Sequence, residues 1–285
     1  MQEDWNVGLV RQNMEDFIKT KKLGKPLFAP ASSNNKFKAD VFIRESGGEL
    51  ELFFEDFDYK VFRGKISRMI FRPDEGVFSK ADTFIEKDFH LAFPFYWTFD
   101  GKEYIVAETS EAGNLTAFEI MDDKIVSEKI IMKSDCVDAV IFRHSGLYWM
   151  LCTRKKYGTN INLFLYYSQK PFENWESHPM NPVVSDVRKA RMAGAFIKVG
   201  ERLFRPAQKN DISYGEKIVI QEITELTKER YSEKEAFVLD AKEFAPYNKG
   251  VHTISAAADF IALDAKKYKF VPAAFARKLK SKLSR

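Results

Sequence analysis

The sequence predicts an all-β fold, a five-bladed β-propeller with a short basic C-terminal helix. First, 14% of the 285 residues are aromatic, with 26 Phe and 11 Tyr, and aromatic rings favour strands because they pack well on pleated faces. Second, a strand, a glycine-containing turn and another strand recur five times, as in β-hairpins. Third, these hairpins begin 44 to 59 residues apart, with further strand-like runs between them, which is enough chain for a four-stranded blade. A pair of β-sandwiches is the alternative, but it does not account for five hairpins of one form.

The elements before the hairpins are a strand and a brief helix. Residues 5–10 are expected to form the strand, and residues 14–22 the helix, which ends near Gly24 and Pro26. In a closed ring the strand would pair with the last blade. The inner strands of the five hairpins are expected to begin at equivalent positions: Asp40, Pro94, Asp138, Ala193 and His252.

Residues 1–265 are therefore expected to form the propeller, and residues 266–285 a basic amphipathic tail. Phe275, Leu279 and Leu283 recur at helical spacing, and the tail carries eight Lys or Arg residues and no Asp or Glu. Since the net charge of the whole chain is only +4, the propeller itself is slightly acidic, and no nucleic-acid partner is expected. The tail is interpreted either as a solvated helix or as a peripheral contact with an anionic membrane surface.

Nothing in the sequence predicts a metal or a cofactor. Cys136 and Cys152 lie in hydrophobic strands and are expected to be buried free thiols in a reducing compartment, since their spacing is not that of metal ligands. No apolar run reaches the length of about 18 residues that a membrane span needs, and residues 1–5 are too polar for a signal peptide. We therefore expect a cytoplasmic protein, with the inner face of the membrane as an alternative location.

The candidate site lies at one mouth of the central channel, where the inner strands of a propeller begin and the neighbouring strands end. Carboxylates interleaved with Arg and His suit sugar chemistry there, because one carboxylate takes a proton from the attacking hydroxyl and another group protonates the leaving oxygen. Carboxylates crowded together also raise one another's pKa values, which separates acid from base. The candidates at equivalent strand positions are Asp40, Glu55, Glu108, Asp138, Arg191, Arg205, Gln208 and His252, joined by His90 and the turn residue Tyr214.

Structural roles compete with these functional ones. The Asp40 carboxylate at a strand start could bind backbone amides, and Glu55 could belong to an acidic surface loop. Asp138 is different, because it lies between Val137 and Ala139 in an apolar strand. A lone buried carboxylate costs several kcal/mol unless it is paired, so a functional role is favoured there.

Nine short motifs occur in this order along the sequence: His90-x-x-Phe93-Pro94, Glu108-Thr109-Ser110-x-Ala112-Gly113, Val137-Asp138-Ala139, His178-Pro179-x-Asn181-Pro182, Ala190-Arg191-x-Ala193-Gly194, Arg205-Pro206-Ala207-Gln208, Tyr214-Gly215, Ile223-Thr224-Glu225-Leu226 and His252-Thr253. Together they resemble the N-terminal propeller domain of plant glucosamine inositolphosphorylceramide transferases and its bacterial relatives in polysaccharide-synthesis loci. The resemblance covers about residues 5–265, and the family is in turn similar to the five-bladed propellers of arabinanases and β-xylosidases.

The resemblance implies a role for each carboxylate. In the glycosidases, an Asp at the start of the first blade is the base, a second Asp tunes, and a Glu is the acid. Carried over, Asp40 becomes the base candidate, Asp138 the tuning carboxylate and Glu108 the acid candidate. Two departures weaken a hydrolase assignment: Val41 follows Asp40 where these glycosidases usually have Pro, and the second blade has Pro94 where an Asp is expected.

The favoured hypothesis is a glycosyltransferase in cell-surface polysaccharide or glycolipid assembly. Asp40 or Glu55 would deprotonate the hydroxyl of a glycan or lipid-linked acceptor. Arg191, Arg205 and His252 would bind the phosphate of an activated sugar donor, because fixed cations suit a leaving phosphate. A glycoside hydrolase or glycan phosphorylase is the first alternative, and a non-catalytic glycan-binding propeller the second.

Overall fold

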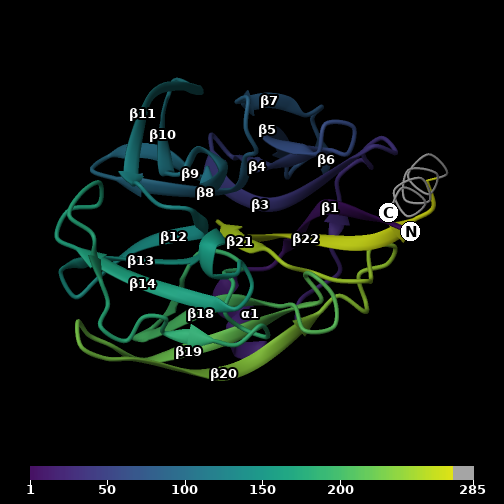
Figure 1. Cartoon of the computed structure of the whole chain (residues 1–285). Helices are drawn as coiled ribbons and strands as arrows, with labels where there is room; N and C mark the ends of the chain where they lie inside the picture. Colours follow the sequence, from purple (N-terminus) through teal and green to yellow (C-terminus); the bar gives the residue numbers. More distant parts are fainter. Residues whose placement is uncertain (272–285) are drawn as a thin grey trace, which may run out of the picture.

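The chain forms a ring of five antiparallel sheets, which confirms the predicted all-β, five-bladed propeller (Figure 1). The computed structural model describes residues 1–271 of the 285. Each sheet is one blade, and its first strand in the order below is the inner strand. Blade 1 contains β3 (Lys36–Ser46), β4 (Glu49–Asp58), β5 (Arg63–Arg72), β6 (Val77–Phe78) and β7 (Asp82–Ile85).

The other four blades repeat this plan. Blade 2 contains β8 (Ala92–Phe99), β9 (Lys102–Glu108), β10 (Leu115–Met121) and β11 (Lys124–Met132). Blade 3 contains β12 (Cys136–His144), β13 (Leu147–Arg154), β14 (Asn162–Ser168), β15 (Glu176–Ser177) and β16 (Val184–Ser185). Blade 4 contains β17 (Ile197–Val199), β18 (Arg202–Lys209), β19 (Lys217–Leu226) and β20 (Tyr231–Asp240). Blade 5 contains β21 (Ile254–Ala257), β22 (Phe260–Lys269), β1 (Gln2–Arg11) and β2 (Leu27–Phe28).

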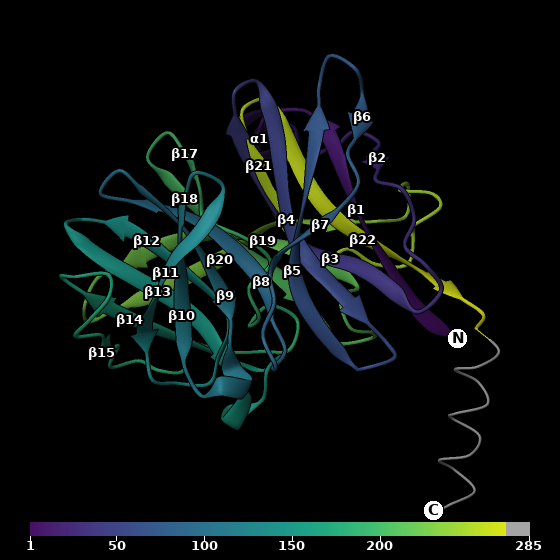
Figure 2. The same cartoon turned by 90° about the horizontal axis from the view of Figure 1, so that it is seen from above.

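The two ends of the described chain close the ring, as expected. Strand β1 pairs with β22 from Gln2 opposite Lys269 to Arg11 opposite Phe260, so the two strands lie side by side (Figure 2). The helix expected after β1 is α1 (Met14–Thr20), and the Asn13 side chain caps it by accepting a hydrogen bond from the Asp16 amide. The first and last strands therefore hold each other in one sheet, and no blade edge is left open at the junction.

The hydrophobic core lies between neighbouring blades. Val41 of β3, for example, belongs to the same buried cluster as Val7 of β1, and Phe53 of β4 to the same cluster as Ile105 of β9. Each blade thus buries both faces, which matches the many continuous apolar runs in the strands.

The two cysteines are buried free thiols, as expected. Cys136 on β12 and Cys152 on β13 are both fully buried, and their Sγ atoms lie 3.2 Å apart. Both belong to the core shared by blades 2 and 3, where a thiol packs as a small apolar group.

The helix predicted in the tail, residues 271–283, lies outside the described residues except for Val271. Strand β22 runs to Lys269, so residues 266–269 continue the last blade instead of beginning the tail, and Lys266 is fully buried. None of the helices within residues 1–271 is long and apolar enough to cross a bilayer. The cytoplasmic location stays a prediction.

The inner strands of blades 1, 2 and 3 share one backbone irregularity. Asp40, Phe93 and Asp138 all have positive φ angles, of 54°, 46° and 50°, where the register with the neighbouring strand shifts. Such bulges redirect side chains and cluster near functional sites. The residue equivalent to Asp40 in blade 2 is therefore Phe93 and not Pro94, as the spacing had suggested.

Gly194 allows blades 4 and 5 to approach each other closely. Its φ is 148°, and an added Cβ would overlap the carbonyl oxygen of Ile254, whose amide donates to Ala193. We expect Gly194→Ala to lower the free energy of unfolding by about 2–4 kcal/mol, measured by urea denaturation. Gly200→Ala is the matched control, because Gly200 also has a positive φ but open space around it, and it should cost only about 1 kcal/mol. Equal losses in the two variants would show that the blade contact is not what requires Gly194.

Candidate active site

A central cavity of about 250 Å³ opens at the end of the propeller where the inner strands begin. It is smaller than the roughly 300–1,000 Å³ of sites that enclose drug-sized ligands, and it suits about one sugar ring. Seven of the ten predicted site residues line it: Asp40, Glu55, His90, Glu108, Arg191, Tyr214 and His252. The structure therefore brings these acids and bases, which are far apart in the sequence, together at one cavity, as predicted.

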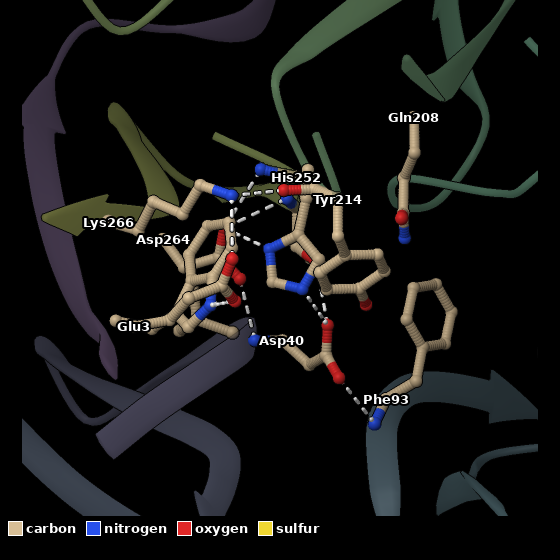
Figure 3. Close-up of polar contacts among 12 residues, drawn as sticks. Glu3, Asp40, Phe93, Gln208, Tyr214, His252, Asp264 and Lys266 are labelled. Carbon is tan, nitrogen blue, oxygen red and sulfur yellow. Dashed lines mark hydrogen bonds and ion pairs between the residues drawn. The ribbon is translucent and has the colours of Figure 1, made fainter. Parts of the chain in front are cut away.

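Asp40 lies at one end of a chain of polar contacts that runs through His252 to Asp264 (Figure 3). Its Oδ1 accepts from the Thr253 hydroxyl at 3.0 Å and lies 3.3 Å from His252 Nε2, while its Oδ2 accepts from the Phe93 amide at 3.3 Å. Burial raises the pKa of Asp40 to about 6, although His252 opposes this. At neutral pH the Asp40 carboxylate is thus mostly ionised and held in one orientation.

Asp264 lies at the other end of this chain. Its two carboxylate oxygens accept the backbone amides of Asp40, His252 and Thr253, and His252 Nδ1 lies 2.8 Å from Oδ1. Burial alone would lower the pKa of His252, but the Asp264 and Asp40 carboxylates outweigh it, and the pKa is raised. His252 therefore keeps its proton to a higher pH than a free histidine does, and it lies between two carboxylates.

The same three residues have the composition of a metal site. Ligand atoms of Asp40, His252 and Asp264 all lie within 4.8 Å of one another. The oxygens of Asp264, however, already accept three backbone amides and the histidine, and backbone donors cannot turn away to admit a cation. The donor set therefore fits a hydrogen-bonded chain better than a cation site, and we assign no metal to it.

Glu108 and Asp138 form the second acidic pair. Asp138 is fully buried, and Arg191 Nε donates to its Oδ2 at 2.5 Å while Gln208 Nε2 donates to the same oxygen at 3.1 Å. Burial, and then the Asp138 carboxylate, raise the pKa of Glu108 to about 7; the Ser110 hydroxyl, which donates at 2.7 Å, opposes this. The Asp138 carboxylate thus raises the pKa of Glu108, and Arg191 compensates its charge. A catalytic role for Asp138 as a tuning carboxylate stays a prediction.

Glu55 and His90 form a further pair of cavity-lining residues. Burial, and then Asp40 and Glu108, raise the pKa of Glu55 well above its usual range, so it holds its proton to a higher pH than an exposed glutamate does. His90 Nδ1 accepts from the Gly64 amide at 3.0 Å, which leaves the ring proton on Nε2, 3.6 Å from Glu55 Oε1. Burial lowers the pKa of His90, so both pKa shifts favour the neutral form, in which each group can hydrogen-bond to a ligand.

Three predicted site residues do not line the cavity: Asp138, Gln208 and Arg205. Asp138 and Gln208 lie next to it, because Asp138 binds Arg191 and Gln208 binds Asp138, but Arg205 points away. Its side chain is fully buried on the other face of β18, where Nη2 donates to Glu233 at 2.7 Å and to the Lys189 carbonyl at 2.7 Å. Gln208, three residues on, points to Asp138 instead. The role of Arg205 as a phosphate ligand is therefore corrected to a structural ion pair within blade 4.

Three residues of the site were not predicted: Asp264, Trp5 and Lys155, the last of which also lines the cavity. Asp264 lies in the apolar strand 261–265, the same signal that identified Asp138, and could have been found in that way. Trp5 lines the cavity, and its ring packs against His252 with 4.1 Å between the ring centroids. Nothing in the spacing of β1 distinguishes Trp5 from an ordinary core residue.

Comparisons with known proteins identify the family. The family model described as "Glucosamine inositolphosphorylceramide transferase 1, N-terminal" matches residues 25–266. The Arabidopsis thaliana protein named glucosamine inositolphosphorylceramide transferase 1 is 29% identical over 222 residues, which are 75% of this chain and 29% of that protein. The Oryza sativa subsp. japonica protein of the same name is 26% identical over 206 residues, 70% of this chain and 28% of that protein. The chain thus spans less than a third of the length of these curated relatives.

Solved structures of similar fold are glycoside hydrolases. A family 117 glycoside hydrolase from Zobellia galactanivorans has a TM-score of 0.56 at 12% identity, over 87% of this chain and 95% of that one. A thermostable family 43 glycoside hydrolase has a TM-score of 0.55 at 13% identity, over 75% of this chain and 80% of that one. At such identities the likeness shows the fold alone. The family model, by contrast, covers most of the sequence, and the chain belongs to the family of the N-terminal domain of glucosamine inositolphosphorylceramide transferase 1.

Proposed function

We propose that this chain is a glycosyltransferase of cell-surface glycolipid or polysaccharide assembly and holds one sugar ring in its central cavity. The observation that carries the proposal is the set of three buried carboxyl groups around one small cavity, all with raised pKa values. Keeping such groups together costs stability, and that cost is typical of sites of acid–base chemistry. The transferase name of the relatives supports transfer, although the chain spans only part of those proteins.

The two carboxyl groups with the lower pKa values divide the chemistry. Asp40, mostly ionised, takes the proton of the acceptor hydroxyl as its oxygen bonds to the anomeric carbon. The bond from that carbon to the leaving oxygen breaks, and Glu108 in its protonated form gives that oxygen a proton. Asp138 raises the pKa of Glu108 and so keeps a larger fraction of it protonated at neutral pH.

The donor phosphate needs a different partner from those predicted. Arg191 is bound to Asp138, and His252 lies between two carboxylates, so neither is free to neutralise a phosphate. Lys155 lines the cavity at its exposed rim, and no carboxylate within residues 1–271 lies within ion-pair distance of its Nζ. We therefore place the phosphate of an activated donor at Lys155, outside the cavity that holds the sugar.

A glycoside hydrolase is the second candidate. The same acid–base pair would serve water as acceptor, and no fully buried, unpaired cation faces the cavity within the described residues. Incubation with activated sugar donors and a lipid-linked acceptor, followed by mass spectrometry, tests the first proposal. Release of reducing sugar from oligosaccharides without any donor would support the second, and a ligand-induced rise in Tm without turnover would leave only binding.

We expect a bell-shaped pH dependence of kcat/KM for transfer. The rate should fall below about pH 6, where Asp40 takes up its proton, and above about pH 7, where Glu108 loses the proton that it donates. Initial rates between pH 4.5 and 9 check this. A rate that keeps rising to pH 9 would contradict an acid role for Glu108.

A further inference from the structure

The loops around the cavity mouth carry the most exposed apolar side chains of the folded ring. In blades 1 to 4, these loops follow the second strand, whose last residues reach the cavity, as Glu55 and Glu108 do. Ile212 is 79% exposed, Phe62 72% and Val61 62%. Apart from Met1 and Phe270 near the two ends, no other large apolar side chain within residues 1–271 is as exposed.

Phe62 is held outward by a strained backbone. Its φ of 53° belongs to the left-handed region, which a bulky residue rarely adopts. Its ring contacts Phe57, which lines the cavity, with centroids 6.1 Å apart, and Tyr59 at 6.0 Å. The Tyr59 hydroxyl donates to the Glu3 carbonyl at 2.9 Å, so the hairpin is fixed to the start of β1. The exposed tip is thus supported by a wall of rings that begins in the cavity.

Positive charge lies on the same rim. Lys60, Lys155 and Lys156 are exposed, and no carboxylate within the described part of the chain is in ion-pair distance of them. The chain also leaves the propeller here, because Lys269 at the end of β22 pairs with Gln2, next to the Glu3 carbonyl that holds the hairpin. The sequence that follows, residues 272–285, contains five Lys or Arg and no Asp or Glu.

We propose that the rim formed by residues 60–62, 155–157 and 212 rests on an anionic lipid bilayer, with the cavity mouth facing its surface. Val61, Phe62 and Ile212 enter the interfacial region, and Lys60 and Lys156 face anionic headgroups. Lys155, which lines the cavity, is the residue that we assign to the donor phosphate. The exposed apolar side chains belong to different blades around the mouth. A bilayer can contact all of them at once, because its surface is broad and deformable. The choice of a lipid-linked substrate rests on the proposed function; the contact with the bilayer rests on the rim itself.

Vesicle co-sedimentation of the full chain tests the contact. We expect binding to phosphatidylcholine vesicles that contain phosphatidylserine, little binding to phosphatidylcholine alone, and weaker binding at high salt. The double variant Val61→Ser/Phe62→Ser should bind at least about tenfold more weakly, because two apolar side chains no longer enter the interface. Met121→Ser is the matched control, since Met121 is 58% exposed on the β10–β11 hairpin at the opposite end of its blade, and it should bind as the unchanged protein does.

Other outcomes overturn the proposal. Binding that survives Val61→Ser/Phe62→Ser but is lost when the Lys and Arg residues of 272–285 are replaced by Gln would assign the contact to that segment alone. A change in oligomeric state in the double variant, seen by light scattering, would make the rim a protein interface. Transfer to a soluble acceptor separates this proposal from the proposed function, because the double variant should retain it. Vesicle binding without any transfer would leave the rim in place and remove the transferase assignment.

Discussion

Replacing Glu108 by Gln is expected to lower the rate of glycosyl transfer by a factor of about 10²–10⁴ while the fold stays intact. Glutamine keeps the size of the side chain and its contact with Ser110, but it has no proton to give to the leaving oxygen. The test compares kcat and KM of the variant with those of the unchanged protein, and we expect the loss in kcat. Glu45→Gln is the matched control, because Glu45 is exposed at the far end of β3 and its replacement should leave both constants unchanged.

The leaving group provides a sharper form of this test. A donor whose leaving group is a weakly basic phenol departs without protonation, so Glu108→Gln should cost it much less rate than it costs a donor with an alkyl leaving group. Asp40→Asn should instead slow both donors alike, because the acceptor still needs a base. Equal losses for both donors in Glu108→Gln would show that Glu108 is not the acid.

Glu108→Gln should also be more stable than the unchanged protein at pH 8. A carboxyl group with a raised pKa binds more protons in the folded than in the unfolded state between its ordinary pKa and about 7, so stability falls as the pH rises through that window. The glutamine side chain of the variant does not titrate and escapes this loss. We expect a gain of about 1–3 kcal/mol at pH 8 that vanishes at pH 4, measured by urea denaturation. No gain at pH 8 would mean that Glu108 is not strained by its surroundings.

The repeat of hairpins predicted the ring, because inner strands at regular intervals leave few other ways to bury two-sided apolar strands. The spacing did not predict which residue of each blade occupies the position of Asp40. Phe93, and not Pro94, is equivalent to Asp40, because a bulge inserts a residue whose position depends on the backbone and not on the side-chain pattern. The equivalent positions of the blades could therefore be predicted only to within one residue. A shift of one residue along a strand decides whether a side chain faces the cavity or the core.

The alternation of a strand explains the prediction that was wrong. Arg205 and Gln208 lie three residues apart on β18, so their side chains point to opposite faces and only one of them can approach the cavity. Gln208 binds Asp138, and Arg205 binds Glu233. Because side chains alternate along a strand, the sequence shows that Arg205 and Gln208 face opposite sides. It does not show which residue of a neighbouring strand Arg205 binds, because that depends on the register between the strands.

Arg191→Met is expected to lower the free energy of unfolding by about 3–5 kcal/mol at neutral pH, the largest stability loss that a single change in this site should produce. Asp138 is fully buried, and without Arg191 its carboxylate would keep only the amide of Gln208 as a partner. Methionine fills similar space with an apolar side chain, so the loss reports the uncompensated charge and not a cavity. Chemical denaturation at pH 7 measures it.

Asp138→Asn provides the matched partner for a double-mutant cycle. In Arg191→Met/Asp138→Asn the buried charge is absent, so the double variant should lose clearly less stability than the two single variants together predict. If Arg191→Met were as stable as the unchanged protein at pH 7, Asp138 would not need Arg191 as a counter-ion. The tuning of Glu108 by an ionised Asp138 would then fail with it, because both depend on that one buried negative charge.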